Sequence, residues 1–266
     1  MPRALGYSLA FLIAGPAALD ADDLGAIKAR GVLRAIVSMD GLPEGVSLRQ
    51  GTPPGMEREM IESFAGLQRL RVEFVPVPTG GDRIPALLAG KGDVIVGSLV
   101  VTEARRKQVD FTAEVFPGRS VVVSYRPHPA VESLEQLRKE RVGTLKGSSW
   151  AEQVAAAEVP PDKVDDSFSS PDQVLQGLRS HKVSAVVMTL GWALLEKRKD
   201  PAVELGYLFP PSPGRAWGVP KDAPQLRQAL DEYIANMRRT PTWSRLVVKY
   251  YGDLALEVLR KSSATP

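Results

Sequence analysis

Residues 84–112 read IPALLAGKGDVIVGSLVVTEARRKQVDFT, and this stretch decides the fold. The apolar run DVIV at 93–96 predicts a buried strand, and the segment before it, 83–89, predicts a short helix. Gly97 and Ser98 follow the strand directly, and Arg105 comes within a turn or two. Open α/β sheets bind ligands at the carboxyl ends of their strands. We therefore expect a binding site here, in which the planar guanidinium of Arg105 can hold a carboxylate.

Short apolar strands and helices alternate in both directions from this stretch. In the first half, elements are predicted over 32–37, 56–67, 70–77, 83–89, 93–96 and 119–125. The alternation then restarts, with elements predicted over 133–140, 141–144, 149–157, 171–180, 183–188, 192–199, 217–219, 224–238 and 242–250. Such alternation is typical of α/β folds in which helices flank parallel-rich sheets.

Two similar α/β halves joined at two places predict two lobes with a cleft between them. We expect residues 22–123 with 215–266 to form the first lobe, and residues 124–214 the second. The C-terminal segment thus returns to the first lobe.

The N-terminal segment has the composition of a secretory signal. Arg3 supplies a positive charge, residues 4–19 are mostly apolar but interrupted by Gly15-Pro16, and small residues lie around the expected cleavage site. The apolar run is shorter than the roughly 20 residues that a bilayer span needs. We expect residues 1–21 to be a cleaved signal peptide and the mature protein to be periplasmic; a buried first helix is the alternative.

Composition excludes several kinds of chemistry. The 266 residues contain no cysteine, which rules out disulfides, thiolate catalysis and cysteine-ligated zinc. The net charge is only +3, and Lys and Arg are spread along the chain, so nucleic-acid binding is not expected. The two histidines, His128 and His181, lie in polar or proline-rich contexts typical of a surface. Neither a phosphate-binding loop nor a metal-ligand motif is present, and we expect neither cofactor nor metal.

The segment Lys146-Gly147-Ser148-Ser149 follows a predicted strand and opens a predicted helix. Unpaired backbone N–H groups and the positive end of the helix dipole favour an anion at such a place. Alternatively, Ser148 or Ser149 simply caps the helix.

The order of these segments resembles the family 3 periplasmic solute-binding proteins of ABC importers. The resemblance covers nearly all of residues 31–252, from GVLRAIV through VGTLKGSSWAE to WSRLVVKYYG. Its most specific part is TEARRKQVDF at 102–111, which is similar to the family's T-x-x-R-x-x-x-V-D-F. The resemblance implies a two-lobed periplasmic-binding-protein fold, a double-stranded hinge and closure around a small ligand. It also implies an importer permease as partner, and we expect a monomer.

In the resembled family, the arginine of this motif binds the α-carboxylate of an amino acid, which implies that role for Arg105. The resemblance implies that Ser148 and Ser149 share the carboxylate and that Gly97 and Ser98 add polar contacts. The family's aspartate for the α-amino group corresponds to Thr189, whose hydroxyl cannot pair with an ammonium as a carboxylate does. Asp40 or Glu44 could substitute, or the ligand lacks the ammonium.

We expect a binding protein for an amino acid or a related organic acid, without enzymatic activity. Two alternatives remain. One is a secreted lyase of the cyclohexadienyl dehydratase type, which the same resemblance includes. The other is a sensory or partner-docking module.

Overall fold

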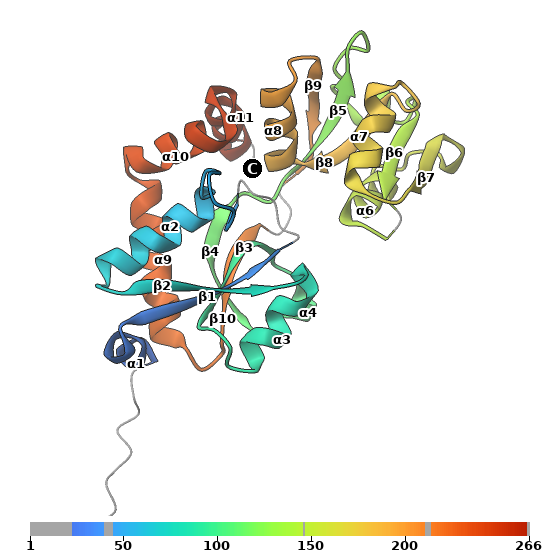
Figure 1. Ribbon diagram of the computed structural model, residues 1–266. Helices are drawn as coiled ribbons and strands as arrows, with labels where there is room; N and C mark the ends of the chain where they lie inside the picture. The colour runs from blue at the N-terminus through green and yellow to red at the C-terminus, as the bar shows by residue number, and fades with distance from the viewer. Residues whose placement is uncertain (1–22, 40–44, 146, 211–213, 265–266) are drawn as a thin grey trace, which may run out of the picture.

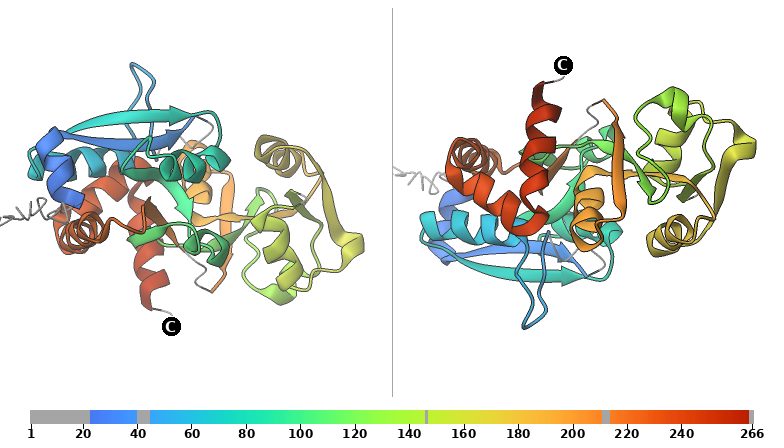
Figure 2. Two further views of the ribbon diagram at one scale, coloured as in Figure 1. Left: turned by 90° about the horizontal axis from the view of Figure 1, so that it is seen from below. Right: turned by 90° about the horizontal axis from the view of Figure 1, so that it is seen from above.

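The computed structural model describes residues 23–39, 45–145, 147–210 and 214–264, and it contains two five-stranded sheets in two separate lobes (Figure 1). The first sheet has the order β2-β1-β3-β10-β4 and the second β7-β6-β8-β5-β9. Views from below and above keep the two lobes apart (Figure 2). The predicted two-lobed α/β fold is confirmed.

The first sheet combines parallel and antiparallel pairs. Its strands are β1 (Val32–Ser38), β2 (Arg71–Val77), β3 (Val94–Val100), β4 (Asp110–Phe116) and β10 (Arg215–Val219). β1 is parallel to β2 and β3, whereas β10 lies antiparallel between β3 and β4. The late strand β10 therefore returns the chain to the middle of the first sheet.

Helices cover both faces of this sheet, and the two-residue period of the strands divides the core. The first lobe contains α1 (Asp23–Arg30), α2 (Met56–Leu67), η1 (Gly80–Asp82), α3 (Arg83–Leu88), α4 (Glu103–Arg106), α9 (Pro224–Arg238), α10 (Pro241–Tyr251) and α11 (Asp253–Ala264). Leu33 and Ala35 of β1 belong to the same core cluster as Phe64 of α2. Ile36, on the opposite face of β1, clusters with Leu87 of α3. Because both faces are buried, β1 is a nearly continuous apolar run.

The second sheet repeats this plan. Its strands are β5 (Ser120–Tyr125), β6 (Val142–Leu145), β7 (Val164–Phe168), β8 (Ala185–Thr189) and β9 (Val203–Leu208). Its helices are α5 (Leu134–Leu137), α6 (Ser149–Ala156), η2 (Pro161–Lys163), α7 (Pro171–Arg179) and α8 (Leu190–Lys199). β6 is parallel to β7 and β8, and β5 is antiparallel to β8 and β9. This sheet is therefore mixed as well.

Two segments connect the lobes, as a double-stranded hinge requires. The chain leaves the first sheet after Phe116 and enters the second at Ser120, and it returns between Leu208 and Arg215. The crossing segments are joined, since the backbone N–H of Phe209 donates to the Ser120 carbonyl at 2.9 Å. The predicted lobe boundary at residue 124 falls inside β5, four residues beyond the point where that strand begins at Ser120.

Gly214 is the last residue of the second crossing. A Cβ placed there would come within 2.1 Å of Glu114 Oε1, so a larger residue would displace that side chain. The Gly214 carbonyl also accepts from Val101 N–H at 3.1 Å, which ties the crossing to the end of β3.

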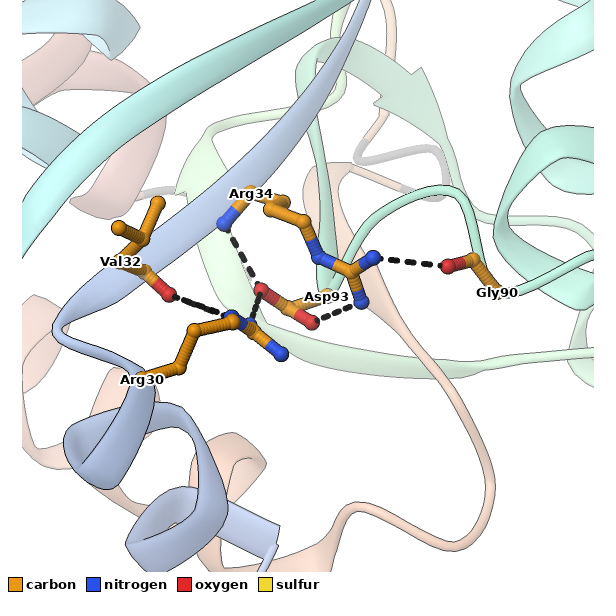
Figure 3. A network of polar contacts seen from close by, with 5 residues as sticks. All are labelled: Arg30, Val32, Arg34, Gly90 and Asp93. Atoms are coloured by element: carbon orange, nitrogen blue, oxygen red, sulfur yellow. Dashed lines mark hydrogen bonds and ion pairs between the residues drawn. The ribbon is translucent and has the colours of Figure 1, made fainter.

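A buried carboxylate fastens the start of β3 to α1 and β1 (Figure 3). Asp93, only 8% exposed, accepts from Arg30 Nη2 at 2.5 Å and from Arg34 Nη2 at 2.8 Å. The backbone N–H of Arg34 donates to the same carboxylate at 2.8 Å, and Arg34 Nη1 donates to the Gly90 carbonyl at 3.0 Å. The hydrogen bond to Asp93 raises the pKa of Arg34.

Asp93→Asn should lower the free energy of unfolding by about 2 kcal/mol, because hydrogen bonds to charged groups contribute about 1.5–3 kcal/mol each and one amide cannot satisfy both arginines. Denaturant unfolding followed by circular dichroism measures the loss. Asp162→Asn, at an exposed position, is the control and should change the stability by less than about 0.5 kcal/mol. Equal effects of the two substitutions would contradict a structural role for Asp93.

Candidate functional site

A cavity of about 220 Å³ lies between the lobes and contains residues from both. The first lobe contributes Val100, Val101, Thr102 and Arg215, and the second contributes Glu152, Gln153, Thr189 and Gly191. The hinge segment 116–120 completes the lining. A hollow formed at the junction of two lobes is a usual place for a small ligand.

Arg215 spans this cavity from the first lobe to the second. Its Nη2 donates to Thr189 Oγ1 at 3.1 Å, and its Nη1 donates to Ser98 Oγ at 3.4 Å. The Thr189 hydroxyl makes no capping bond to α8, so it is available to the guanidinium. The structure thus brings two predicted site residues, Ser98 and Thr189, to one arginine that the sequence did not single out.

Arg105 lies at the same end of β3 and is half-buried. Its backbone N–H donates to Thr102 Oγ1, the N-cap of α4, at 3.3 Å, and its Nη1 donates to the Val100 carbonyl at 2.7 Å. Among the residues that the structure describes, Arg105 forms no ion pair. The neighbouring Arg106 is exposed and lies 3.9 Å from Glu103.

Gly97 and Ser98 are held by the buried carboxylate of Glu57 on α2. Its two oxygens accept from Gly97 N–H at 2.9 Å, Ser98 N–H at 2.8 Å, Ser98 Oγ at 3.1 Å and the Trp217 indole N–H at 2.9 Å. Gly97 has φ +94°, which favours glycine, and its carbonyl accepts from Arg83. Both backbone groups of Gly97 are therefore used inside the first lobe. Glu57 is a structural residue that the sequence analysis did not recognise.

Ser148 caps α6, the second of the two interpretations that the sequence left open. Its Oγ accepts from Ala151 N–H at 3.3 Å and donates to the Leu145 carbonyl at 2.7 Å. Gly147 precedes it with φ +71°. The side chain of Ser149, the first residue of α6, lies outside the described part of the structure, as do Asp40 and Glu44. Ser148 does not line the cavity, whereas Glu152 and Gln153 of the same helix do.

A larger hollow of about 490 Å³ also has walls from both lobes, but its cations are already engaged. Arg198 of α8 donates to the carbonyls of Lys249 and Tyr250 at 2.7 and 2.8 Å, and Lys249 pairs with Glu59 at 2.5 Å. Burial raises the pKa of Tyr250, and its hydrogen bond to Glu59 raises it further. This hollow therefore marks a contact between α8 and α10 rather than a polar ligand site.

The sequence held a signal for Arg215. It comes two residues after the proline-rich crossing and begins the strand that returns to the first lobe. A residue at such a crossing must lie beside the cleft. Arg119, in the other crossing segment, lines the same cavity and was missed for the same reason.

Within the described ranges, no three His, Cys, Asp or Glu side chains are grouped so that they could hold a metal ion. Over the same residues, no helix has the length and apolar character needed to cross a bilayer.

Two hinged lobes, with a cavity between them that carries both apolar and polar side chains, define a ligand-binding protein of the two-lobed type. The family of bacterial extracellular solute-binding proteins, family 3, matches residues 33–253, and the chain belongs to this family.

The chain is similar to binding proteins of known name. It is 27% identical over 213 residues to the histidine-binding periplasmic protein of Escherichia coli K12, covering 76% of this chain and 80% of that protein. It is 25% identical over 251 residues to the lysine/arginine/ornithine-binding periplasmic protein of the same strain, covering 84% and 95%. An ancestral arginine-binding protein bound to arginine aligns with a TM-score of 0.63 and 27% identity, covering 84% and 99%.

An enzyme is found on the same fold. An ancestral cyclohexadienyl dehydratase aligns with a TM-score of 0.62 and 21% identity, covering 87% of this chain and 97% of that one. At this identity the likeness concerns the fold alone.

Glu57→Ala should lower the free energy of unfolding by about 3 kcal/mol or more, because each buried donor left without an acceptor costs about 1–3 kcal/mol. Urea unfolding followed by tryptophan fluorescence measures the change. Glu62→Ala on the same helix is the matched control. The Glu62 side chain is 41% exposed and, within the described residues, its ion pair is with Arg58, so its removal should cost less than about 0.5 kcal/mol. A similar loss in both variants would contradict the role assigned to Glu57.

Proposed function

We propose that this protein captures a small carboxylate-bearing molecule between its lobes and delivers it to the membrane permease of an ABC importer. The observation that carries the proposal is the interlobe cavity, whose wall combines the guanidinium groups of Arg215 and of Arg119 in the hinge with hydroxyl and amide groups of the second lobe. Membership of the solute-binding family supports it. The ligand is an amino acid or a related organic acid.

Arg105 is the proposed anchor for the carboxylate. One Nη1 bond to the Val100 carbonyl fixes the direction of the guanidinium and leaves its other donors for the ligand. A guanidinium can grip a carboxylate through two parallel N–H···O bonds. Thr102, Ser98 and Thr189 would supply neutral hydrogen bonds around it.

Capture depends on movement at the hinge. A ligand that touches both lobes binds the closed form more tightly, and this differential affinity shifts the population towards closure. Val100 and Thr102 on one side and Gln153 and Thr189 on the other would be the first surfaces to meet such a ligand.

The periplasm is the proposed location. Arg3 with the apolar run after it supports export, and so do relatives whose names call them periplasmic. The mature protein would act there as a monomer that docks on the permease.

Catalysis on this scaffold would require a general acid or base in the cleft. Glu152, which is exposed, is the acidic side chain among the described residues of the cavity wall. Recovery of the bound ligand unchanged, checked by mass spectrometry, separates binding from a lyase reaction.

A thermal-shift panel of the standard amino acids and of short mono- and dicarboxylates tests the function, because a ligand of the folded state raises the melting temperature. For any compound that binds, Arg105→Ala should weaken the affinity at least tenfold, since loss of one partner of a desolvated ion pair costs about 2–5 kcal/mol. Isothermal titration calorimetry measures the change.

Arg106→Ala is the matched control, because Arg106 is adjacent to Arg105 but exposed. The affinity of this variant for the compound should stay within about twofold of that of the wild type. Equal weakening by the two substitutions would refute Arg105 as the anchor.

Closure should reduce the radius of gyration when a compound from the panel saturates the protein, because both lobes then contact it. Small-angle X-ray scattering with and without the compound measures this. An unchanged radius at saturation would mean that the ligand binds to one lobe only.

A further inference from the structure

Arg215, like Arg105, lacks the ion pair that the other half-buried arginines of the described structure form. Arg34 pairs with Asp93 at 2.8 Å and Arg58 with Glu62 at 2.8 Å. In the described part of the structure, the guanidinium of Arg215 donates to two hydroxyls, those of Thr189 and Ser98. Over the described ranges, no acidic side chain lies within ion-pair distance of it. Its charge therefore faces the cavity without a carboxylate of its own.

The carboxylate of Glu57 is linked to Arg215 through Ser98, but both of its oxygens already accept hydrogen bonds. Glu57 lies behind Ser98, and its two oxygens accept from two backbone amides, one hydroxyl and one indole. Arg215 reaches this group only through the Ser98 hydroxyl. A charged group removed from water needs both hydrogen bonds and a partner of opposite charge. The two hydroxyls give Arg215 hydrogen bonds but no opposite charge.

The sheet register places this guanidinium beside the proposed anchor. In the antiparallel pair β3–β10, Arg215 lies opposite Val100, and residues directly opposite have Cα atoms about 4.5–5.5 Å apart. The Val100 carbonyl is the group that holds Arg105 Nη1 at 2.7 Å. Arg105 and Arg215 therefore flank one residue of the cavity wall, and they come from segments more than a hundred residues apart.

We infer that the pair Arg105 and Arg215, at the end of β3, selects a dianion, and that the ligand is a short dicarboxylate without an ammonium group. The inference rests on the proposed function, since Arg105 is taken as the anchor for the first carboxylate. Arg215 binds the second carboxylate, and Thr189 and Ser98 orient its guanidinium. The second carboxylate of the ligand would be the negatively charged partner that Arg215 does not have among the described residues.

An α-amino acid fits this arrangement poorly. Its ammonium would lie within reach of a guanidinium, and like charges in a partly desolvated site repel. Glu152 is the acidic group among the described wall residues, and it is exposed. The chain's relatives are named for histidine, lysine, arginine and ornithine, and Arg215 is a reason to expect a different ligand here.

The test is calorimetry of the full-length mature protein with malonate, succinate, glutarate and adipate. These dicarboxylates differ in the distance between their carboxylates, so the one that binds best indicates the separation of the groups that Arg105 and Arg215 bind. Butyrate and valerate are the monocarboxylate controls, and L-glutamine and L-arginine are the amino-acid controls. At least one dicarboxylate should bind ten times more tightly than every monocarboxylate and amino acid in the set.

Substitutions then show which arginine binds each carboxylate of the ligand. Arg215→Gln keeps hydrogen-bonding capacity and removes the charge; it should lower the affinity for the best dicarboxylate at least tenfold and leave the affinity for butyrate within about twofold. Arg105→Gln should lower the affinity for both compounds. Arg106→Gln is the exposed control and should change neither affinity. Glu152→Gln should not lower the affinity for the dicarboxylate. Melting temperatures within a few degrees of the wild type verify that each variant is folded.

The outcomes separate the two proposals. Tighter binding of an amino acid, abolished by Arg105→Gln but not by Arg215→Gln, overturns the dianion inference and keeps the proposed function. A dicarboxylate affinity that Arg215→Gln leaves unchanged also overturns the inference. Failure of every carboxylate and amino acid tested here and in the wider panel overturns the proposed function itself.

Discussion

The buried carboxylate of Glu57 is the interaction on which the cleft depends. It lies on α2 but fixes the carboxyl end of β3, through Gly97 and Ser98, and the centre of β10, through the Trp217 indole. Trp217 is fully buried, so the indole N–H needs an acceptor inside the core. One side chain therefore fixes both strands that carry the candidate binding residues, and the position of Arg215 beside Val100 follows from that register.

The hinge places these strands beside the second lobe. The chain crosses once after β4 and returns once before β10, so the residues next to both crossings border the cavity. Arg119 and Arg215 occupy these places, and each supplies a positive charge. Away from the cleft, buried arginine–carboxylate pairs such as Arg34 with Asp93 are complete. Arg215 forms no ion pair with a carboxylate in the part of the chain that the structure describes, and it lies where the two lobes meet, which is the arrangement expected for an anion that bridges them.

Most of the strands could be predicted, and those that could not share a position in the fold. Buried strands such as β1 and β8 are apolar runs that the sequence reveals directly. The strands that were missed, β4, β7 and β9, are all edge strands of their sheets. VDDSF in β7 exposes polar side chains because an edge strand is only half covered, and its pattern is that of a loop. The resemblance to the family still predicted the correct architecture, because it depends on the order of segments rather than on each strand.

The sequence by itself determined the α/β class, the two halves and the motif around Arg105, because these depend on local periodicity and on residues that are neighbours in the chain. It also located Ser98 and Thr189 at strand ends. The contact of both with Arg215 was decided only by the tertiary structure. Ser98 lies 117 positions and Thr189 lies 26 positions before Arg215 in the sequence, and the local sequence pattern carries no information about such distant pairs. The antiparallel insertion of β10 between β3 and β4 brings them together, because hydrogen bonding of a strand on both edges fixes its register and hence the wall that its first side chain faces.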